Sequence, residues 1–266
     1  MKLALITGAS SGLGQEITKE LATKGYHTIG SARSLDKLKN LAQEVNGSYF
    51  QFYGDDLNSV FDLAEHTYNK FKEEEFEELL VIAAADRHED SVIIENGKKR
   101  YSELSDFSKE YKDSSEKLAV LGPVVLYSAL NSKIDKLDFV YVSSQAAKKE
   151  FWDSGNSVYG KNKRDAEKLF SSFDNVYSLR FGFIDTEMAD KIIGQLEGVE
   201  RFVHVNEDFN NPLKDKSELC LPVNLVARDI SGFIENKENF KKVEKNIYEY
   251  TVSPSKELYY KYLVNT

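Results

Sequence analysis

Cysteines, histidines and long apolar runs are scarce in this chain of 266 residues. Cys220 is the only cysteine, which excludes an internal disulfide and a cysteine-rich metal site. The histidines are scattered along the sequence without the spacing of metal ligands: His27, His66, His88 and His204. We therefore expect no metal site.

A surplus of positive charge is also missing, because the formal net charge is −9. Phosphate backbones would be repelled, so nucleic acid is not an expected partner. No stretch approaches the roughly 20 apolar residues that cross a membrane, and no basic and apolar leader precedes the first apolar run at Leu3. With 41% hydrophobic residues, the chain is expected to form one domain over residues 1–266 and to be cytoplasmic.

Three glycines directly follow the first apolar run. The run Leu3–Ile6 predicts a buried strand, and Thr7 leads into Gly8, Gly12 and Gly14 with the spacing G-x-x-x-G-x-G. A helix is predicted to begin near Gly12 and to end at Gly25. A glycine turn between a strand and a helix N-terminus favours phosphate, because the backbone can approach it closely and free N–H groups point toward it.

A tyrosine and a lysine share one face of a later predicted helix. Tyr159 and Lys163 lie four residues apart, one turn along the helix, and Ser144 ends the preceding predicted strand. A phenol has a reference pKa of about 10, and a neighbouring ammonium favours its ionised form, which brings proton transfer toward neutral pH. By itself Y-x-x-x-K arises by chance in a chain with 15 tyrosines, so the glycine turn gives the motif its weight.

Together these motifs resemble the short-chain dehydrogenase/reductase family from Leu3 to about Ser253. The resemblance implies an α/β fold, a three-layer Rossmann-type doubly wound parallel sheet with helices on both faces, and catalysis by Ser144, Tyr159 and Lys163. The segment 180–186 resembles the family's nicotinamide segment, with Phe181 where proline is usual. The residues expected to bind the cofactor are Thr7, Gly8, Ser10, Ser11, Gly12, Leu13, Gly14, Arg33, Ser34, Asp56, Leu57, Ala84, Ala85, Tyr159, Lys163, Gly182, Ile184 and Thr186.

Alternating elements along the chain predict a parallel sheet covered by helices. Further strands are expected at Tyr26–Ser31, Tyr49–Tyr53, Leu79–Ala85, Asp138–Ser143, Val176–Arg180 and Asn246–Val252. Helices are expected at Leu35–Val45, Val60–Phe71, Glu116–Leu130, Ser157–Phe173, Thr186–Glu197 and Pro222–Ile234, with Gly122-Pro123 interrupting the third. Residues 86–115 predict a polar surface excursion with a short helix at 105–111, and residues 187–215 a substrate lid.

The end of the second strand indicates the choice of cofactor. NAD-specific sites place an acidic residue there, but here no carboxylate occurs before Asp36. Arg33 offers a planar cation for a 2′-phosphate and Ser34 a hydroxyl, which favours NADP(H) over NAD(H). The alternative is a helix-capping Ser34 beside a solvated Arg33. Asp56 contacts adenine by resemblance, or instead caps the next helix.

Two positions depart from the family pattern. Ala84-Ala85-Asp86 stands where Asn-Ala-Gly is usual, so Asp86 replaces a glycine. Alignment on Gly122-Pro123 places Ala119 where the family has its catalytic Asn, which helps to hold a water for proton delivery. An alanine side chain cannot hydrogen-bond, so this departure bears on the rate of reaction more than on the fold.

The expected function is that of an NADP-dependent oxidoreductase that interconverts a carbonyl and an alcohol on a small organic substrate. Phe151 and Trp152, in the loop after Ser144, either line the substrate pocket or pack the loop. The alternatives are a catalytically weak or inactive NADP-binding sensor or interaction protein and, since fold does not fix reaction, a lyase or isomerase. By analogy with the family, a homodimer or homotetramer would form through the helices predicted at Glu116–Leu130 and Ser157–Phe173.

Overall fold

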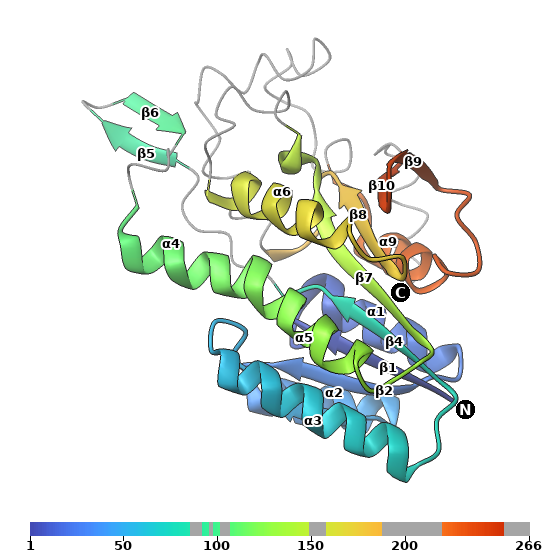
Figure 1. Ribbon diagram of the computed structural model, residues 1–266. Coiled ribbons are helices and arrows are strands. Elements are labelled where there is room, and N and C mark those ends of the chain that lie inside the picture. The colour runs from blue at the N-terminus through green and yellow to red at the C-terminus, as the bar shows by residue number, and fades with distance from the viewer. Residues whose placement is uncertain (86–91, 96–97, 102–106, 149–157, 188–219, 253–266) are drawn as a thin grey trace.

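The computed structural model describes residues 1–85, 92–95, 98–101, 107–148, 158–187 and 220–252 (Figure 1). Eight strands form one sheet in the order β3-β2-β1-β4-β7-β8-β10-β9, parallel throughout except for the antiparallel edge strand β9. The strands are β1 Lys2–Thr7, β2 His27–Ala32, β3 Ser48–Gln51, β4 Glu78–Ala83, β7 Leu137–Ser144, β8 Val176–Phe181, β9 Phe240–Glu244 and β10 Ile247–Tyr250.

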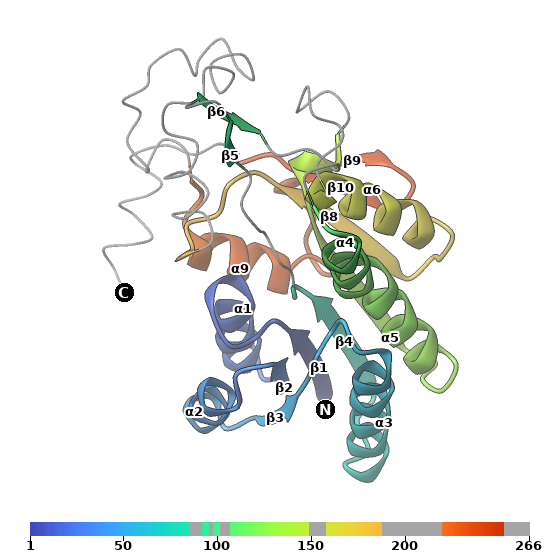
Figure 2. The same cartoon turned by 90° about the vertical axis from the view of Figure 1, so that its left-hand side faces the viewer.

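Helices cover both faces of this sheet, which gives three layers (Figure 2). One face carries α1 Gly12–Thr23, α2 Leu35–Val45 and α9 Val223–Ser231. The other carries α3 Leu57–Glu73, α4 Lys109–Glu116, α5 Gly122–Asn131 and α6 Val158–Phe170. The predicted doubly wound α/β fold is therefore confirmed.

The first strand explains why two separate cores form. Its side chains alternate, so that Leu3 and Leu5 join the core beneath α3 and α5 while Ala4 and Ile6 join the core beneath α1 and α9. A strand buried on both faces is typical of a parallel sheet. The chain runs outward from β1 through β2 to β3 and then returns to β4 on the other side of β1. The strand order reverses there, and ligands of such sheets bind beside that reversal, at the carboxyl ends of the strands.

The predicted boundaries of the first two helices agree closely with the structure. The second helix spans Leu35–Val45, and the first begins at Gly12, with Gly25 beyond its end at a φ of +83°. The structure also contains two elements that were not predicted. The stretch expected to be an excursion contains a hairpin of β5 Val92–Glu95 and β6 Lys98–Tyr101. The sheet also gains the unpredicted antiparallel strand β9, so it is not wholly parallel.

The long helix before β7 differs from the predicted Glu116–Leu130. It starts earlier as α4, whose first residue is Lys109, passes through the π-helical segment η2 Lys117–Leu121, and continues as α5 (Figure 1). These three segments form one rod. Its α-helical pattern is interrupted just before Gly122-Pro123, as expected, by the π-helical turn that ends at Leu121, and α5 begins at Gly122 with Pro123 in its first turn. A Cβ on Gly122 would lie 2.7 Å from the Gly54 carbonyl oxygen, so the close approach of the rod to that loop requires glycine.

Candidate active site

The segment Thr7–Gly14, here called the glycine turn, follows β1 at the strand reversal. Gly8 and Gly12 have φ angles of +76° and +54°, in the region that side chains rarely adopt. A Cβ on Gly14 would collide with the Gly8 carbonyl, so α1 can approach the turn this closely only with glycine there. Ser11 occupies the N-cap of α1 without a side-chain hydrogen bond. The first-turn N–H groups lack intrahelical partners by geometry and suit an anion.

Two other strand ends reach the glycine turn. The Ala85 N–H donates to Thr7 Oγ1 at 3.2 Å, and a Cβ on Gly8 would lie 2.9 Å from Ala85 Cα. A Cβ on Gly12 would lie 3.3 Å from Thr186 Cγ2, beyond the end of β8. The structure therefore brings together predicted cofactor residues from three separate segments, and the fit leaves space for backbone rather than for side chains.

A short bridge holds the segment after β8 in this position. Ile184 pairs with Leu221, which makes hydrogen bonds to both neighbours of Ile184: it accepts from the Asp185 N–H at 2.8 Å and donates its own N–H to the Phe183 carbonyl at 2.9 Å. Gly182 lies in the same segment, where a Cβ would meet no atom within 4 Å. This glycine is thus not required by packing against the described residues.

The residues predicted to select NADP lie at the far end of β2. Arg33 and Ser34 are both exposed, and the Arg33 guanidinium makes no hydrogen bond or ion pair with the part of the chain that the structure describes. Ser34 occupies the N-cap position of α2, but its side chain makes no capping bond. Ser34 is therefore at the capping position without using its hydroxyl for a capping bond. The side chains of Arg33 and Ser34 are both accessible to a ligand.

The two aspartates after β3 have structural partners. Asp56 is the N-cap of α3 and accepts from the Asn58 N–H at 3.0 Å, while Leu57 begins the helix and packs on the core. Asp55 accepts from the Ser114 hydroxyl at 2.7 Å, which ties the loop to α4. The capping role that the sequence left open for Asp56 is therefore observed, and its adenine contact stays a prediction.

Tyr159 and Lys163 meet on α6, as their spacing predicts. The Lys163 ammonium is buried and donates to the Val142 carbonyl at 2.7 Å, two residues before Ser144. Its Nζ lies 5.5 Å from the ring centroid of Tyr159 and 4.8 Å from that of Tyr141. A cation at this range is attracted to the ring face and acts electrostatically on both phenols.

Ser144 ends β7 and begins the next turn. Its Oγ accepts from the Ala146 N–H at 3.2 Å, at the start of the short 3₁₀ turn η3 Gln145–Ala147. This bond fixes the hydroxyl oxygen at the carboxyl edge of the sheet, the edge at which the glycine turn also lies. A hydroxyl that accepts from a backbone amide can still donate its proton to a second oxygen.

Ala119 lies within η2, and its surroundings contain polar groups that the sequence did not reveal. Ala119 is buried, and its carbonyl oxygen accepts from the Tyr141 hydroxyl at 2.8 Å. One turn earlier, the buried Ser115 hydroxyl accepts from the Asn162 amide at 2.9 Å. Single π turns often occur at functional sites. Tyr141 could be suspected only from its place on the same strand as Ser144, and Asn162 only from its place beside Lys163.

Some predicted features lie outside the described residues. They are Asp86, the loop with Phe151 and Trp152, and, from residue 188 onward, the helix expected at Thr186–Glu197 and the lid expected at residues 187–215. None of the helices in the described ranges combines the length and the apolar character needed to cross a membrane.

The fold and the position of the site define a Rossmann-type dinucleotide-binding class. The family model for short chain dehydrogenase matches residues 2–195. The chain belongs to the short-chain dehydrogenase family.

Solved structures share this fold across nearly the whole chain. An alcohol dehydrogenase from Thermococcus sibiricus, solved with 5-hydroxy-NADP, superposes with a TM-score of 0.67 at 21% identity, covering 96% of this chain and 97% of the other. A short chain dehydrogenase from Burkholderia cenocepacia, solved with NADP, gives 0.67 at 17% identity, with 96% and 98% covered.

Curated relatives match over shorter or more divergent stretches. An uncharacterised oxidoreductase of Staphylococcus epidermidis is 23% identical over 200 residues, which cover 71% of this chain and 80% of the relative. An NADPH-dependent 1-acyldihydroxyacetone phosphate reductase of Saccharomyces cerevisiae is 40% identical over 57 residues, 21% of this chain. That match spans only about a fifth of the relative, 19% of its length.

Proposed function

We propose that this protein is an NADP-dependent oxidoreductase that interconverts a carbonyl and an alcohol on a small organic substrate. The observation that supports this most strongly is that the glycine turn and the Tyr159–Lys163 pair lie at the same carboxyl edge of the sheet. NADP-bound neighbours with the same fold are consistent with it. When bound, the dinucleotide supplies or accepts a hydride.

The glycine turn and the neighbouring strand ends would hold the dinucleotide. The first-turn amides of α1 suit its pyrophosphate, and the glycines allow the close approach that a Cβ would prevent. Arg33 and Ser34 would bind the 2′-phosphate, because both are exposed at the end of β2 and the guanidinium can bind two oxygens at once.

Three side chains would handle the substrate oxygen. Ser144 donates a hydrogen bond that orients the carbonyl, and the Tyr159 hydroxyl donates the proton that the developing alkoxide requires. In the opposite direction Tyr159 takes the proton back. Lys163 stabilises the phenolate form of Tyr159 through its charge, and its bond to the Val142 carbonyl holds that charge in place.

A second candidate is a protein that binds the cofactor with little or no turnover. Ala119 favours it, since its side chain has no hydrogen-bonding group and its carbonyl already accepts from Tyr141. Loss of NADPH absorbance should be measured against a panel of ketones, aldehydes and quinones, with Tyr159→Phe as the matched variant. Oxidation that depends on Tyr159 supports the enzyme. Tight NADPH binding without oxidation of any panel member supports the alternative, and activity that survives in Tyr159→Phe contradicts the assigned mechanism.

We also propose a homodimer or homotetramer paired through the rod and α6. Leu121 and Leu169 lie on these helices and remain 38% and 43% exposed. Light scattering gives the mass in solution, and Leu169→Glu should lower it if α6 forms the interface. A wild-type protein with the mass of a monomer would contradict the pairing.

A further inference from the structure

A buried carboxylate lies one turn beyond Lys163 on α6. Glu167 is 2% exposed and accepts three hydrogen bonds through its two oxygens. Oε1 accepts from the Ser143 hydroxyl at 2.6 Å and from Arg180 Nε at 2.8 Å, while Oε2 accepts from Arg180 Nη2 at 2.7 Å. The guanidinium thus binds the carboxylate with two parallel bonds, the most directional ion pair available to side chains.

The ion pair continues across the sheet. Arg180 Nη1 contacts Glu249 on β10 at 3.3 Å, and the same Glu249 oxygen accepts from Lys148 Nζ at 2.8 Å. Bonding to Glu167 raises the pKa of Arg180 above its ordinary value, so the guanidinium remains charged despite its burial. The chain of contacts joins α6, β7, β8 and β10, and it ends four residues after Ser144.

These contacts hold α6 at two consecutive residues of β7. Lys163 binds the carbonyl of Val142 and Glu167 binds the hydroxyl of Ser143, so the helix is held immediately before Ser144. We propose that Glu167 and Arg180 are positioning residues that set Tyr159 and Lys163 against Ser144. The proposal rests on the proposed oxidoreductase function.

A contribution to stability does not by itself explain why Glu167 and Arg180 form a buried ion pair. Burying an ion pair costs solvation, and well-packed apolar side chains often stabilise a core equally well. Its bonds instead fix direction and distance, and a misplacement of about 1 Å at an active site can cost about 10²-fold in rate.

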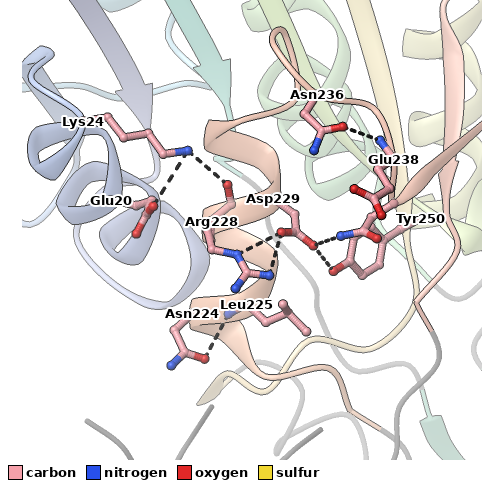
Figure 3. Close-up of polar contacts among 10 residues, drawn as sticks. Glu20, Lys24, Asn224, Leu225, Arg228, Asp229, Asn236, Glu238 and Tyr250 are labelled. Carbon is pink, nitrogen blue, oxygen red and sulfur yellow. Dashed lines mark hydrogen bonds and ion pairs between the residues drawn. The ribbon is translucent and has the colours of Figure 1, made fainter. Parts of the chain in front are cut away.

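A second buried carboxylate provides the matched control. Asp229 on α9 accepts from the Tyr250 hydroxyl at 2.6 Å and the Asn239 amide at 2.8 Å through Oδ2, and from Arg228 through Oδ1 (Figure 3). Its side chain is 8% exposed, and it joins α9 to the β9–β10 hairpin on the face opposite α6. Asp229→Asn therefore disturbs a similar network on the face of the sheet opposite to α6 and Tyr159.

The experiment compares Glu167→Gln and Asp229→Asn at equal NADPH saturation. We expect kcat to fall by about 10- to 100-fold in Glu167→Gln, with KM and NADPH affinity within about twofold of wild type. Asp229→Asn should keep kcat while losing thermal stability. A kcat within twofold of wild type in Glu167→Gln overturns the proposal, as does an equal loss in Asp229→Asn. Should Glu167→Gln not fold, Ser143→Ala and Arg180→Lys take its place under the same criteria.

Amide exchange separates this proposal from the proposed function. Exchange in the peptides covering residues 137–144 and 158–167 should rise in Glu167→Gln and stay unchanged in Asp229→Asn. If the wild-type protein turns over no substrate, the proposed function fails, and the positioning role is then decided by this exchange alone. Unchanged exchange in both peptides overturns it.

Discussion

The glycine turn and helix α6 lie at the same edge of the sheet, but one offers backbone groups and the other offers side chains. The turn offers backbone, and what matters there is the absence of side chains, as the collision of a Cβ on Gly14 with the Gly8 carbonyl demonstrates. Helix α6 offers side chains, whose charges and hydroxyls are held by Val142 and Ser143. In the proposed function, cofactor binding and chemistry are divided between these two regions, so substitutions should affect them separately.

The largest expected effect separates chemistry from binding. Tyr159→Phe removes the hydroxyl proposed as proton donor and should lower kcat by about 10² to 10⁴-fold, the usual contribution of a general acid. NADPH affinity, measured by calorimetry, should remain within about threefold of wild type, since one polar contact at most is lost. A parallel loss of NADPH binding would break the division between the two regions.

The next effect concerns the backbone of the turn. Gly14→Ala introduces a Cβ against the Gly8 carbonyl, and overpacking of this kind lowers the free energy of unfolding by about 1–3 kcal/mol. NADPH affinity should fall by about 10²-fold, since a lost hydrogen bond to a charged group is worth about 1.5–3 kcal/mol.

Gly232→Ala is the matched control for that change. A Cβ on Gly232 first meets the flexible end of Lys24 at 3.3 Å, so affinity and stability should both stay near wild type. Equal NADPH affinity in Gly14→Ala and wild type would show that the glycine turn is not part of the NADPH-binding site.

A smaller effect is expected for the choice between NADPH and NADH, which the residues at the end of β2 are proposed to make. Arg33→Asp replaces the exposed guanidinium with a carboxylate and should weaken NADPH by about tenfold or more relative to NADH, at the low end for charged hydrogen bonds. Lys39→Asp makes a similar charge change at an exposed position of α2. An unchanged ratio of NADPH to NADH affinity in Arg33→Asp would contradict the assignment.

The smallest effect is a pH dependence of stability that arises from two histidines on the side of the sheet that carries the glycine turn. Burial lowers the pKa of His66 on α3, and likewise that of His27 on β2. The unfolded chain therefore binds more protons than the folded protein below about pH 6.5, so stability falls as pH decreases from 7 toward 5. His66→Phe should reduce this fall, because it removes the group that titrates while the ring can still pack on Phe50.

Thermal unfolding at pH 7 and pH 5 measures that difference. At pH 7 both forms of residue 66 are uncharged, so the variant serves there as its own control. An identical decrease in wild type and His66→Phe would show that the acid sensitivity arises elsewhere.

Elements with local signals were predictable from the sequence. The bounds of α2 and the start of α1 follow from helical periodicity and from glycines that permit positive φ. The hairpin of β5 and β6 was missed because its strands span only four residues each within a polar stretch. The π-helical turn was missed because it arises from contacts such as that of Tyr141 with Ala119, which are distant in sequence.

The candidate site divides in the same way. Short spacings gave Gly8 to Gly14 and the pair Tyr159 and Lys163, whereas Glu167 becomes notable only once Arg180 and Ser143 are seen around it. No spacing rule links residues on a helix and two strands, because the sheet order brings them together. Their roles in catalysis and in cofactor binding stay predictions for the experiments above.

Strand β10 has a consequence for the order in which the molecule is completed during synthesis. Its neighbouring residues Glu249 and Tyr250 reach opposite faces of the sheet, one contacting Arg180 and the other Asp229. A nascent chain emerging from the ribosome would already contain the glycine turn, α6 and β8, yet these contacts form only when β10 arrives. The contacts of β10 with Arg180 and Asp229 are therefore completed late in biogenesis, after the segments from β1 to β8 have been synthesised.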